Sequence, residues 1–96
     1  DPDLSFAFCL SKSQYTNYFR LMGKEKNHAK LTLHNEVGTA LECVFWHTGE
    51  SLLTQLDAYF STHNVLIGTV SGKLDINEFR GNKKLQLLNP VLSCQY

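Results

Sequence analysis

The feature that most constrains the fold is a single helical stretch set among segments that alternate like strands. Within residues 50–60, apolar side chains fall at positions 52, 53, 56, 59 and 60, which is one stripe of a helix. Thr48 is the expected N-cap, and Glu50 suits the positive end of the helix dipole. The segments on either side alternate between apolar and polar residues, as strands with one buried face do. This arrangement predicts a mainly β domain with one helix.

Three expected strands precede the helix, at residues 18–22, 30–34 and 40–47. In the third, Leu41, Cys43 and Phe45 share one face, and Trp46 lies on the other. The alternation of apolar and polar residues already begins at Tyr15, ahead of the first of these strands. A polar turn at residues 23–27 separates the first two strands. Residues 64–79 and 84–88 are the strands expected after the helix, joined by a hairpin at residues 80–83. Pro90 is expected to restrict further pairing.

The order of three strands, a helix and two strands is that of a five-stranded OB-fold barrel. An SH3-like barrel has no helix of this length at that point. Gly68 and Gly72 lie within the long fourth strand and predict bulges or bends there. The OB-fold-like domain is expected to span residues 19–96. Residues 1–18 are expected to be a lead-in segment, either a first strand or the remainder of an upstream region.

Length and charge narrow the class of protein. The chain has 96 residues, enough for one domain, and 43% of them are hydrophobic, enough for a core. Nine basic residues balance nine acidic ones, which argues against a polybasic DNA binder but not against a few cations on one face. No apolar run approaches the roughly 20 residues of a membrane span. Three cysteines without a CxxC pair favour a reduced, cytoplasmic setting.

Catalysis by this chain has little support in the sequence. The carboxylates are scattered and are expected to be solvated charges on strands and turns. The four histidines lack zinc-site spacing with the cysteines, and there is no Gly-rich phosphate loop or nucleophile elbow. We therefore expect no catalytic residues, no metal site and no cofactor in this chain.

Nucleic-acid binding has more support, because the basic residues cluster in the first turn and in the last hairpin. In an OB-fold these two loops flank the face that binds oligonucleotides. Such a face combines cations along the backbone track with aromatic rings that stack on bases. The predicted interface comprises Lys24, Lys26, Lys30, Arg80, Lys83 and Lys84 as phosphate ligands, Asn27, His28 and Asn82 as hydrogen-bonding groups, and Trp46 and Phe79 as stacking platforms.

Two segments resemble a known family. Residues 74–87, LDINEFRGNKKLQL, resemble the last hairpin of the OB domain of RecJ-type single-strand-specific exonucleases, with Asn-Glu, an aromatic, a variable residue, Gly, basic residues and a Gln. Residues 23–33, with a His-x-Lys-Leu pattern, look like that domain's first turn and second strand. Residues 41–46 stand where its third strand would be. The resemblance covers about residues 19–92, and residues 1–18 lack the Pro- and Gly-containing lead-in that usually precedes this domain.

The resemblance implies a function for the chain. RecJ-type enzymes degrade single-stranded DNA from the 5′ end in recombination and repair, with Mn²⁺ or Mg²⁺ held by DHH-type phosphoesterase domains. The consecutive Asp-His-His of those domains is missing from this sequence. The chain is thus expected to be a DNA-binding module, non-catalytic by itself, with single-stranded DNA and the parent's catalytic domains as partners. Two alternatives stay open: a structural or protein-docking OB module without nucleic-acid contact, and an RNA-binding OB domain.

Overall fold

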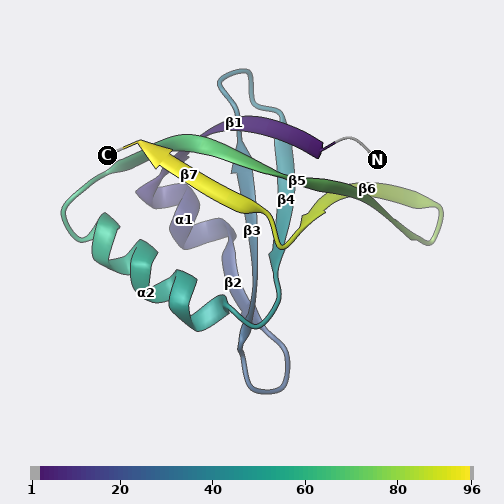
Figure 1. Cartoon of the computed structure of the whole chain (residues 1–96), viewed down its shortest axis with the longest axis horizontal. Coiled ribbons are helices and arrows are strands. Elements are labelled where there is room, and N and C mark those ends of the chain that lie inside the picture. The colour runs from purple at the N-terminus through teal and green to yellow at the C-terminus, as the bar shows by residue number, and fades with distance from the viewer. Residues whose placement is uncertain (1–2, 96) are drawn as a thin grey trace.

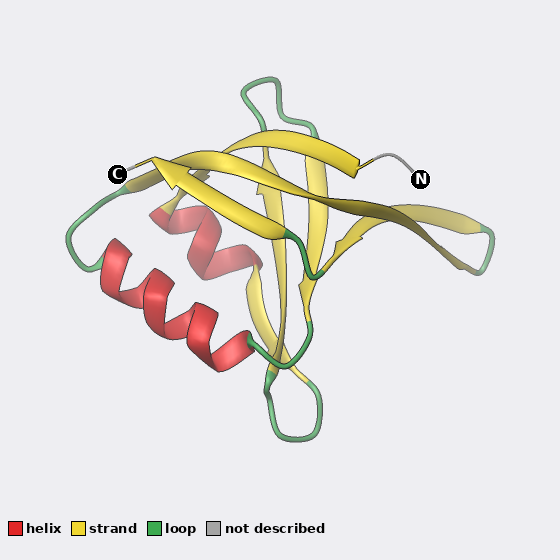
Figure 2. Ribbon diagram, viewed as in Figure 1, coloured by secondary structure: helices red, strands yellow, loops and turns green. Residues whose placement is uncertain are grey.

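A computed structural model describes residues 3–95, apart from the side chains of Asp3, Asn77, Phe79 and Gln95. The elements in chain order are β1 (Asp3–Ser11), α1 (Lys12–Tyr18), β2 (Phe19–Met22), β3 (His28–His34), β4 (Ala40–Phe45), α2 (Gly49–Phe60), β5 (Val65–Phe79), β6 (Asn82–Leu88) and β7 (Val91–Gln95) (Figure 1). The expected all-β class is confirmed, with more strands than the five anticipated. Both helices lie together on one side of the strands (Figure 2).

The strands form a curled sheet with OB-fold topology. Hydrogen-bonded neighbours run in the order β1-β5-β6-β4-β3-β2, and β7 lies beside β5. The strand pairs are antiparallel except β4 with β6, whose parallel pairing joins a three-stranded meander to the hairpin that follows α2. In Figure 1, β1, β5 and β7 cross in front of β3 and β4. The two crossed layers enclose the core.

The first strand of the barrel is split in two by α1. β1 pairs along its whole length with β5, whereas β2 pairs with β3. The alternation predicted from Tyr15 is wrong, because residues 12–18 are helical. A capping box starts this helix: the Ser11 hydroxyl accepts from the Gln14 N–H, and the Gln14 side chain accepts from the Ser11 N–H, both at 3.1 Å. Of the two roles left open for residues 1–18, a first strand is the one that residues 3–11 adopt.

The core follows the predicted faces. Leu31, Leu33, Leu41 and Cys43 are at most 5% exposed, and α2 adds the predicted stripe through Leu52, Leu56 and Phe60. The predicted position of α2 is confirmed. Thr48 occupies the N-cap position but makes no capping hydrogen bond with its side chain.

Pairing continues beyond Pro90, which corrects the expectation that this proline restricts it. β6 pairs with residues 74–79 of β5, and β7 then pairs with residues 67–71 of the same strand. Pro90 is buried against Gly72 and turns the chain from one register to the next. A Cβ at Gly68 would clash with the Ser93 carbonyl, so this glycine allows the close approach of β7.

Beyond the barrel, β5 and β6 continue as a two-stranded arm on the side opposite the helices (Figure 1). Its turn consists of Arg80 and Gly81, with φ of 52° and 80°, as in a type I′ hairpin. The hairpin lies where it was predicted, and positive φ values occur at both Arg80 and Gly81. Cross-strand partners share a face, so Ile76 and Leu85 lie on one side of the arm and Lys84 on the other.

Candidate nucleic-acid interface

One surface of the sheet gathers four of the predicted binding residues: His28, Lys30, Trp46 and Lys84. Because strand residues alternate between faces, the residues opposite the core on β2, β3, β4 and β6 form a common surface, here called the outer face. The strand registers align its members across the strands. The outer face comprises Arg20, Met22, His28, Lys30, Thr32, His34, Ala40, Glu42, Val44, Lys84, Gln86 and Leu88, together with Trp46, which follows β4 and contacts His28.

A buried carboxylate lies at the middle of the outer face. Glu42 on β4 is 5% exposed, although the sequence predicted solvated carboxylates. Its Oε1 lies 3.0 Å from the Lys30 Nζ, and its Oε2 lies 2.9 Å from the Lys84 Nζ. The Gln86 amide also donates to Oε1, at 2.7 Å. Glu42 therefore ties together two of the predicted phosphate ligands, which come from β3 and β6.

The ionisation of Glu42 reflects these contacts. Burial by itself would raise the pKa of the carboxyl group, since a charged group is less stable away from water. Hydrogen bonds from Lys84, Lys30 and Gln86 outweigh that penalty and hold the pKa below its ordinary value. Glu42 is therefore a carboxylate at neutral pH and partly neutralises the two lysines.

Arg20 on β2 adds a cation that the sequence reasoning missed. It stands directly opposite Lys30, so the register places two like charges side by side. Such pairs are unfavourable across strands. Among the described residues, Arg20 forms no ion pair. The exposed charge of Arg20 is thus available to an anion from outside, and the alternation of residues 18–22 was the signal that could have identified it.

Trp46 is exposed at one end of the outer face, in contact with two histidines. Its side chain is 41% exposed, and its ring meets the His28 ring edge-on with centroids 4.9 Å apart. His28 also contacts the His47 ring at 4.7 Å, and its Nδ1 accepts the His47 backbone N–H at 2.9 Å. His47 has a φ of 66°, which is unusual for a residue with a side chain. Because His28 is engaged in this way, it holds the exposed indole in place.

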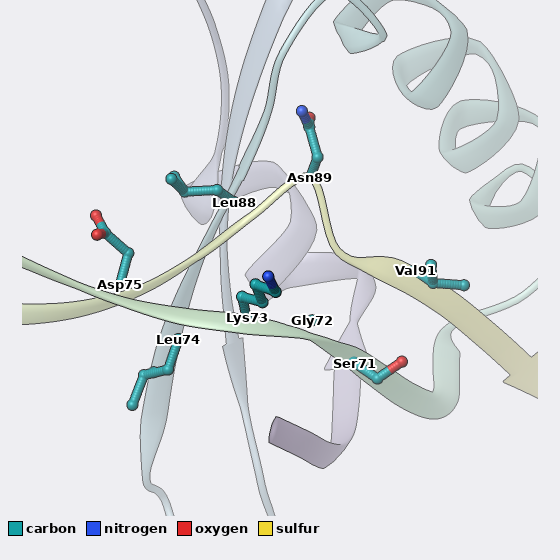
Figure 3. Close-up of a pocket in the computed structure, with 8 residues that line it drawn as sticks. All are labelled: Ser71, Gly72, Lys73, Leu74, Asp75, Leu88, Asn89 and Val91. Carbon is teal, nitrogen blue, oxygen red and sulfur yellow. The ribbon is translucent and has the colours of Figure 1, made fainter. Parts of the chain in front are cut away.

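Asn89 fixes Trp46 from the other side. Its side-chain oxygen accepts the Trp46 backbone N–H at 2.7 Å, and its own N–H donates to the Val44 carbonyl at 2.7 Å. Asn89 also borders an open cavity of about 550 Å³ where the chain passes from β6 to β7. Figure 3 shows Lys73 and Asp75 on the side of β5 that faces Asn89, with Leu74 pointing away. This cavity adjoins the outer face at Leu88, which belongs to both.

The two basic turns differ in how they relate to this surface. Lys24, Lys26 and Asn27 lie in the turn between β2 and β3, next to the Trp46 end, and the Asn27 carbonyl accepts the Gly49 N–H at 2.9 Å. Arg80 forms the turn of the arm, and Asn82 begins β6 on the same face as Lys84. Lys83 lies opposite Glu78 on the other face of the arm. The adjacent lysines of the hairpin are therefore split between two faces.

The histidines, cysteines and carboxylates are the other groups of the described chain that could hold a metal or act as nucleophiles. Within residues 3–95, no three His, Cys, Asp or Glu side chains gather as a metal-binding group. The three cysteines are free thiols, and burial, followed by the charge of Glu42, raises the pKa of Cys43 to about 12. No helix of the described chain is both long and apolar enough to cross a bilayer.

Comparison with known families decides what kind of barrel this is. The sequence model of the RecJ OB domain matches residues 6–89, most of the chain. The chain belongs to the RecJ OB domain family. The match confirms the resemblance seen in the sequence and extends it towards the N-terminus, into β1. Neither the comparison with curated proteins nor that with solved structures finds a match.

In this RecJ OB domain, the structure joins some of the predicted binding residues and separates others. It brings His28 to Trp46, and Lys30 to Lys84 through Glu42. It places Lys83 away from Lys84, and the side chain of Phe79 lies outside the described residues. Sequence reasoning missed Arg20, Glu42, Gln86, His47 and Asn89. That each of the eleven predicted residues contacts nucleic acid stays a prediction.

Proposed function

We propose that this RecJ OB domain binds single-stranded DNA and presents it to the catalytic domains of a RecJ-like 5′–3′ exonuclease acting in DNA recombination and repair. The observation that carries the proposal is the outer face, where an exposed tryptophan and several cations share one surface. Between its basic turns this surface presents Trp46, Lys30, Arg20 and Lys84.

The chemistry of this surface favours a single strand over a duplex. A base can stack on the Trp46 indole only when it is not enclosed in a double helix, and each such contact is worth roughly 1–3 kcal/mol. Lys and Arg neutralise phosphates without reading sequence. We therefore expect binding that tolerates many sequences and weakens as salt rises.

The cleavage step belongs elsewhere in the proposed parent protein. This chain contributes binding, while Mn²⁺ or Mg²⁺ would be held by the parent's DHH-type domains. The proposed setting is the cytoplasm, where such a repair enzyme meets DNA.

The exposed apolar side of the arm favours a second role, as a docking surface for those catalytic domains. Leu74, Ile76 and Leu85 are 43–59% exposed, and cross-strand pairing puts them on the face opposite Lys84. Exposed apolar clusters of this kind mark contact surfaces. The two roles are compatible, because they use opposite faces of the same hairpin.

The domain's single tryptophan gives a direct test of binding. Fluorescence anisotropy of a labelled strand would be measured for single-stranded DNA, its duplex and the matching RNA, at low and at physiological salt. Quenching of Trp46 fluorescence would be followed in the same titrations. We expect salt-sensitive preference for single-stranded DNA, together with quenching.

Other outcomes would point to the alternatives. Equal affinity for RNA and DNA of one sequence would support an RNA-binding OB domain. No binding at low salt would contradict the proposal and leave protein docking as the role of this domain. Binding that survives the double substitution Arg80→Ala and Lys83→Ala would show that the arm turn is not part of the interface.

A further inference from the structure

Glu42 is an anion placed among groups predicted to bind anions. Its carboxylate is 5% exposed, whereas the side chains of Lys30 and Lys84 are 40% and 66% exposed. Each ammonium donates to Glu42 and has three N–H groups, so donors remain that can reach an incoming phosphate. The lysines can therefore contact a DNA strand without leaving the carboxylate.

The carboxylate lies in the middle of the path that a strand would follow across the sheet. Glu42 stands between Thr32 on β3 and Gln86 on β6 in the register, with Lys30 and Lys84 diagonal to it on either side. The Gln86 amide donates to Oε1 as well, which fixes the carboxylate in place. A phosphate bound to either lysine consequently lies near a negative charge that is held in position.

We propose that Glu42 is a built-in counter-anion that weakens the grip of this domain on the phosphate backbone and lowers the salt dependence of binding. The inference rests on the proposed function of the outer face. On this side of the sheet, β2, β3, β4 and β6 carry the cations Arg20, Lys30 and Lys84 and the anion Glu42. The neighbouring strand β5 adds one charge of each sign, Lys73 and Asp75. Glu42 thus cancels about one of the three positive charges on these four strands, and a bound strand is held less tightly than three free cations would hold it.

Ordering of the lysines acts in the opposite direction, because a carboxylate that fixes two lysine side chains lowers the entropy cost of binding. The geometry favours weakening. Ordering helps only the contacts of Lys30 and Lys84, whereas the repulsion acts on every phosphate within a Debye length of about 8–10 Å. The two effects predict opposite changes when the charge of Glu42 is removed.

The test compares Glu42→Gln with Glu36→Gln. Both remove one negative charge, but Glu36 is exposed in the β3–β4 turn, where it borders a cavity against β1 and β5. Affinity for oligo-dT would be measured by anisotropy between about 50 and about 200 mM salt. We expect Glu42→Gln to bind roughly 3- to 10-fold more tightly at low salt. We expect its log–log salt slope to be steeper by about 0.7, one more phosphate contact, and Glu36→Gln to change affinity less than about twofold.

Binding by Glu42→Gln that is weaker than wild type, or no tighter than that of Glu36→Gln, would overturn the inference. If wild type itself does not bind, the proposed function fails, and the inference fails with it. If wild type binds and Glu42→Gln shows no gain, only the role of Glu42 is wrong. Circular dichroism would check folding, and Glu42→Met offers a second uncharged variant, because apolar replacements of buried ions are often tolerated.

Discussion

At one end of the outer face, Trp46 is held by the ring of His28 and the amide of Asn89. Towards the other, Lys30 and Lys84 are held by the carboxylate of Glu42. The first arrangement uses uncharged contacts and leaves the indole open to a base. The second uses charge, and the carboxylate neutralises part of the positive charge of the two lysines that it positions. Two lysines on a binding surface are therefore not equivalent to two free cations.

The largest effect that would test this comparison comes from removing the indole. We expect Trp46→Ala to weaken binding of single-stranded DNA roughly 10- to 100-fold, because a stacked base loses its platform. Trp46→Phe keeps an aromatic face and should lose much less. Anisotropy titration of both variants provides the measurement, and equal affinities for the two would show that no base stacks at this end.

The comparison predicts different effects for two pairs of lysines. Among the described residues, Lys24 and Lys26 form no ion pair, in contrast to Lys30 and Lys84. The double variant Lys24→Gln with Lys26→Asn should flatten the log–log salt slope by about 1.4. Asn suits position 26 because φ is 56° there.

The matched double variant carries Lys30→Gln and Lys84→Gln. We expect it to flatten the slope by clearly less, since Glu42 already neutralises part of that charge. Equal slopes for the two double variants would mean that the ion pairs do not matter for binding.

The ionised Glu42 should also contribute to the free energy of unfolding. The pKa of Glu42 is lowered in the folded chain, so the carboxylate stabilises the fold above its unfolded-state pKa. That contribution is lost as pH falls through the folded pKa. We expect Glu42→Gln to lower the free energy of unfolding by about 1 kcal/mol at neutral pH.

Urea unfolding at several pH values would check this stability effect. The difference between wild type and Glu42→Gln should shrink between about pH 5 and about pH 3. Glu36→Gln serves as the control and should leave the unfolding free energy nearly unchanged. A difference that stays constant with pH would contradict an ionised Glu42 as its source.

The smallest effect is expected from removing the hydrogen bond between the Asn89 side chain and the Trp46 backbone. Asn89→Gly keeps a residue that tolerates the φ of 48° and removes only the side-chain acceptor. Loss of one hydrogen bond, about 1 kcal/mol, should speed amide exchange at Trp46 roughly fivefold. Hydrogen exchange followed by NMR measures it, with Asn82→Gly on the arm as control. Unchanged exchange would show that Asn89 does not restrain the backbone of Trp46.

Local patterns in the sequence predicted the parts of this fold that depend on neighbouring residues. Alternation assigned Leu41 and Cys43 to the core and Trp46 to the other face, and the helical stripe located α2. Neither pattern revealed α1, because seven residues are too few to show a helical period. The signal for that helix was the capping pair Ser11 and Gln14.

Features that depend on distant residues could not be predicted in this way. The burial of Glu42 requires β3, β4 and β6 to align, and its partner Gln86 lies 44 positions along the chain. β7 depends on the free edge of β5, which no pattern near Pro90 reveals. Local patterns identified the predicted binding residues. The charges that are neutralised among them depend on the sheet register, which local patterns do not give.

β7 has one further consequence, which concerns association between copies. The family match ends at residue 89, so β7 lies beyond it, yet β7 covers residues 67–71 of β5. A fragment cut at that limit would present a row of unpaired backbone groups beside the exposed Ile67. Such an open edge can pair with the same edge of another chain. In this protein β7 covers that stretch of β5, so its backbone groups are not open to another chain.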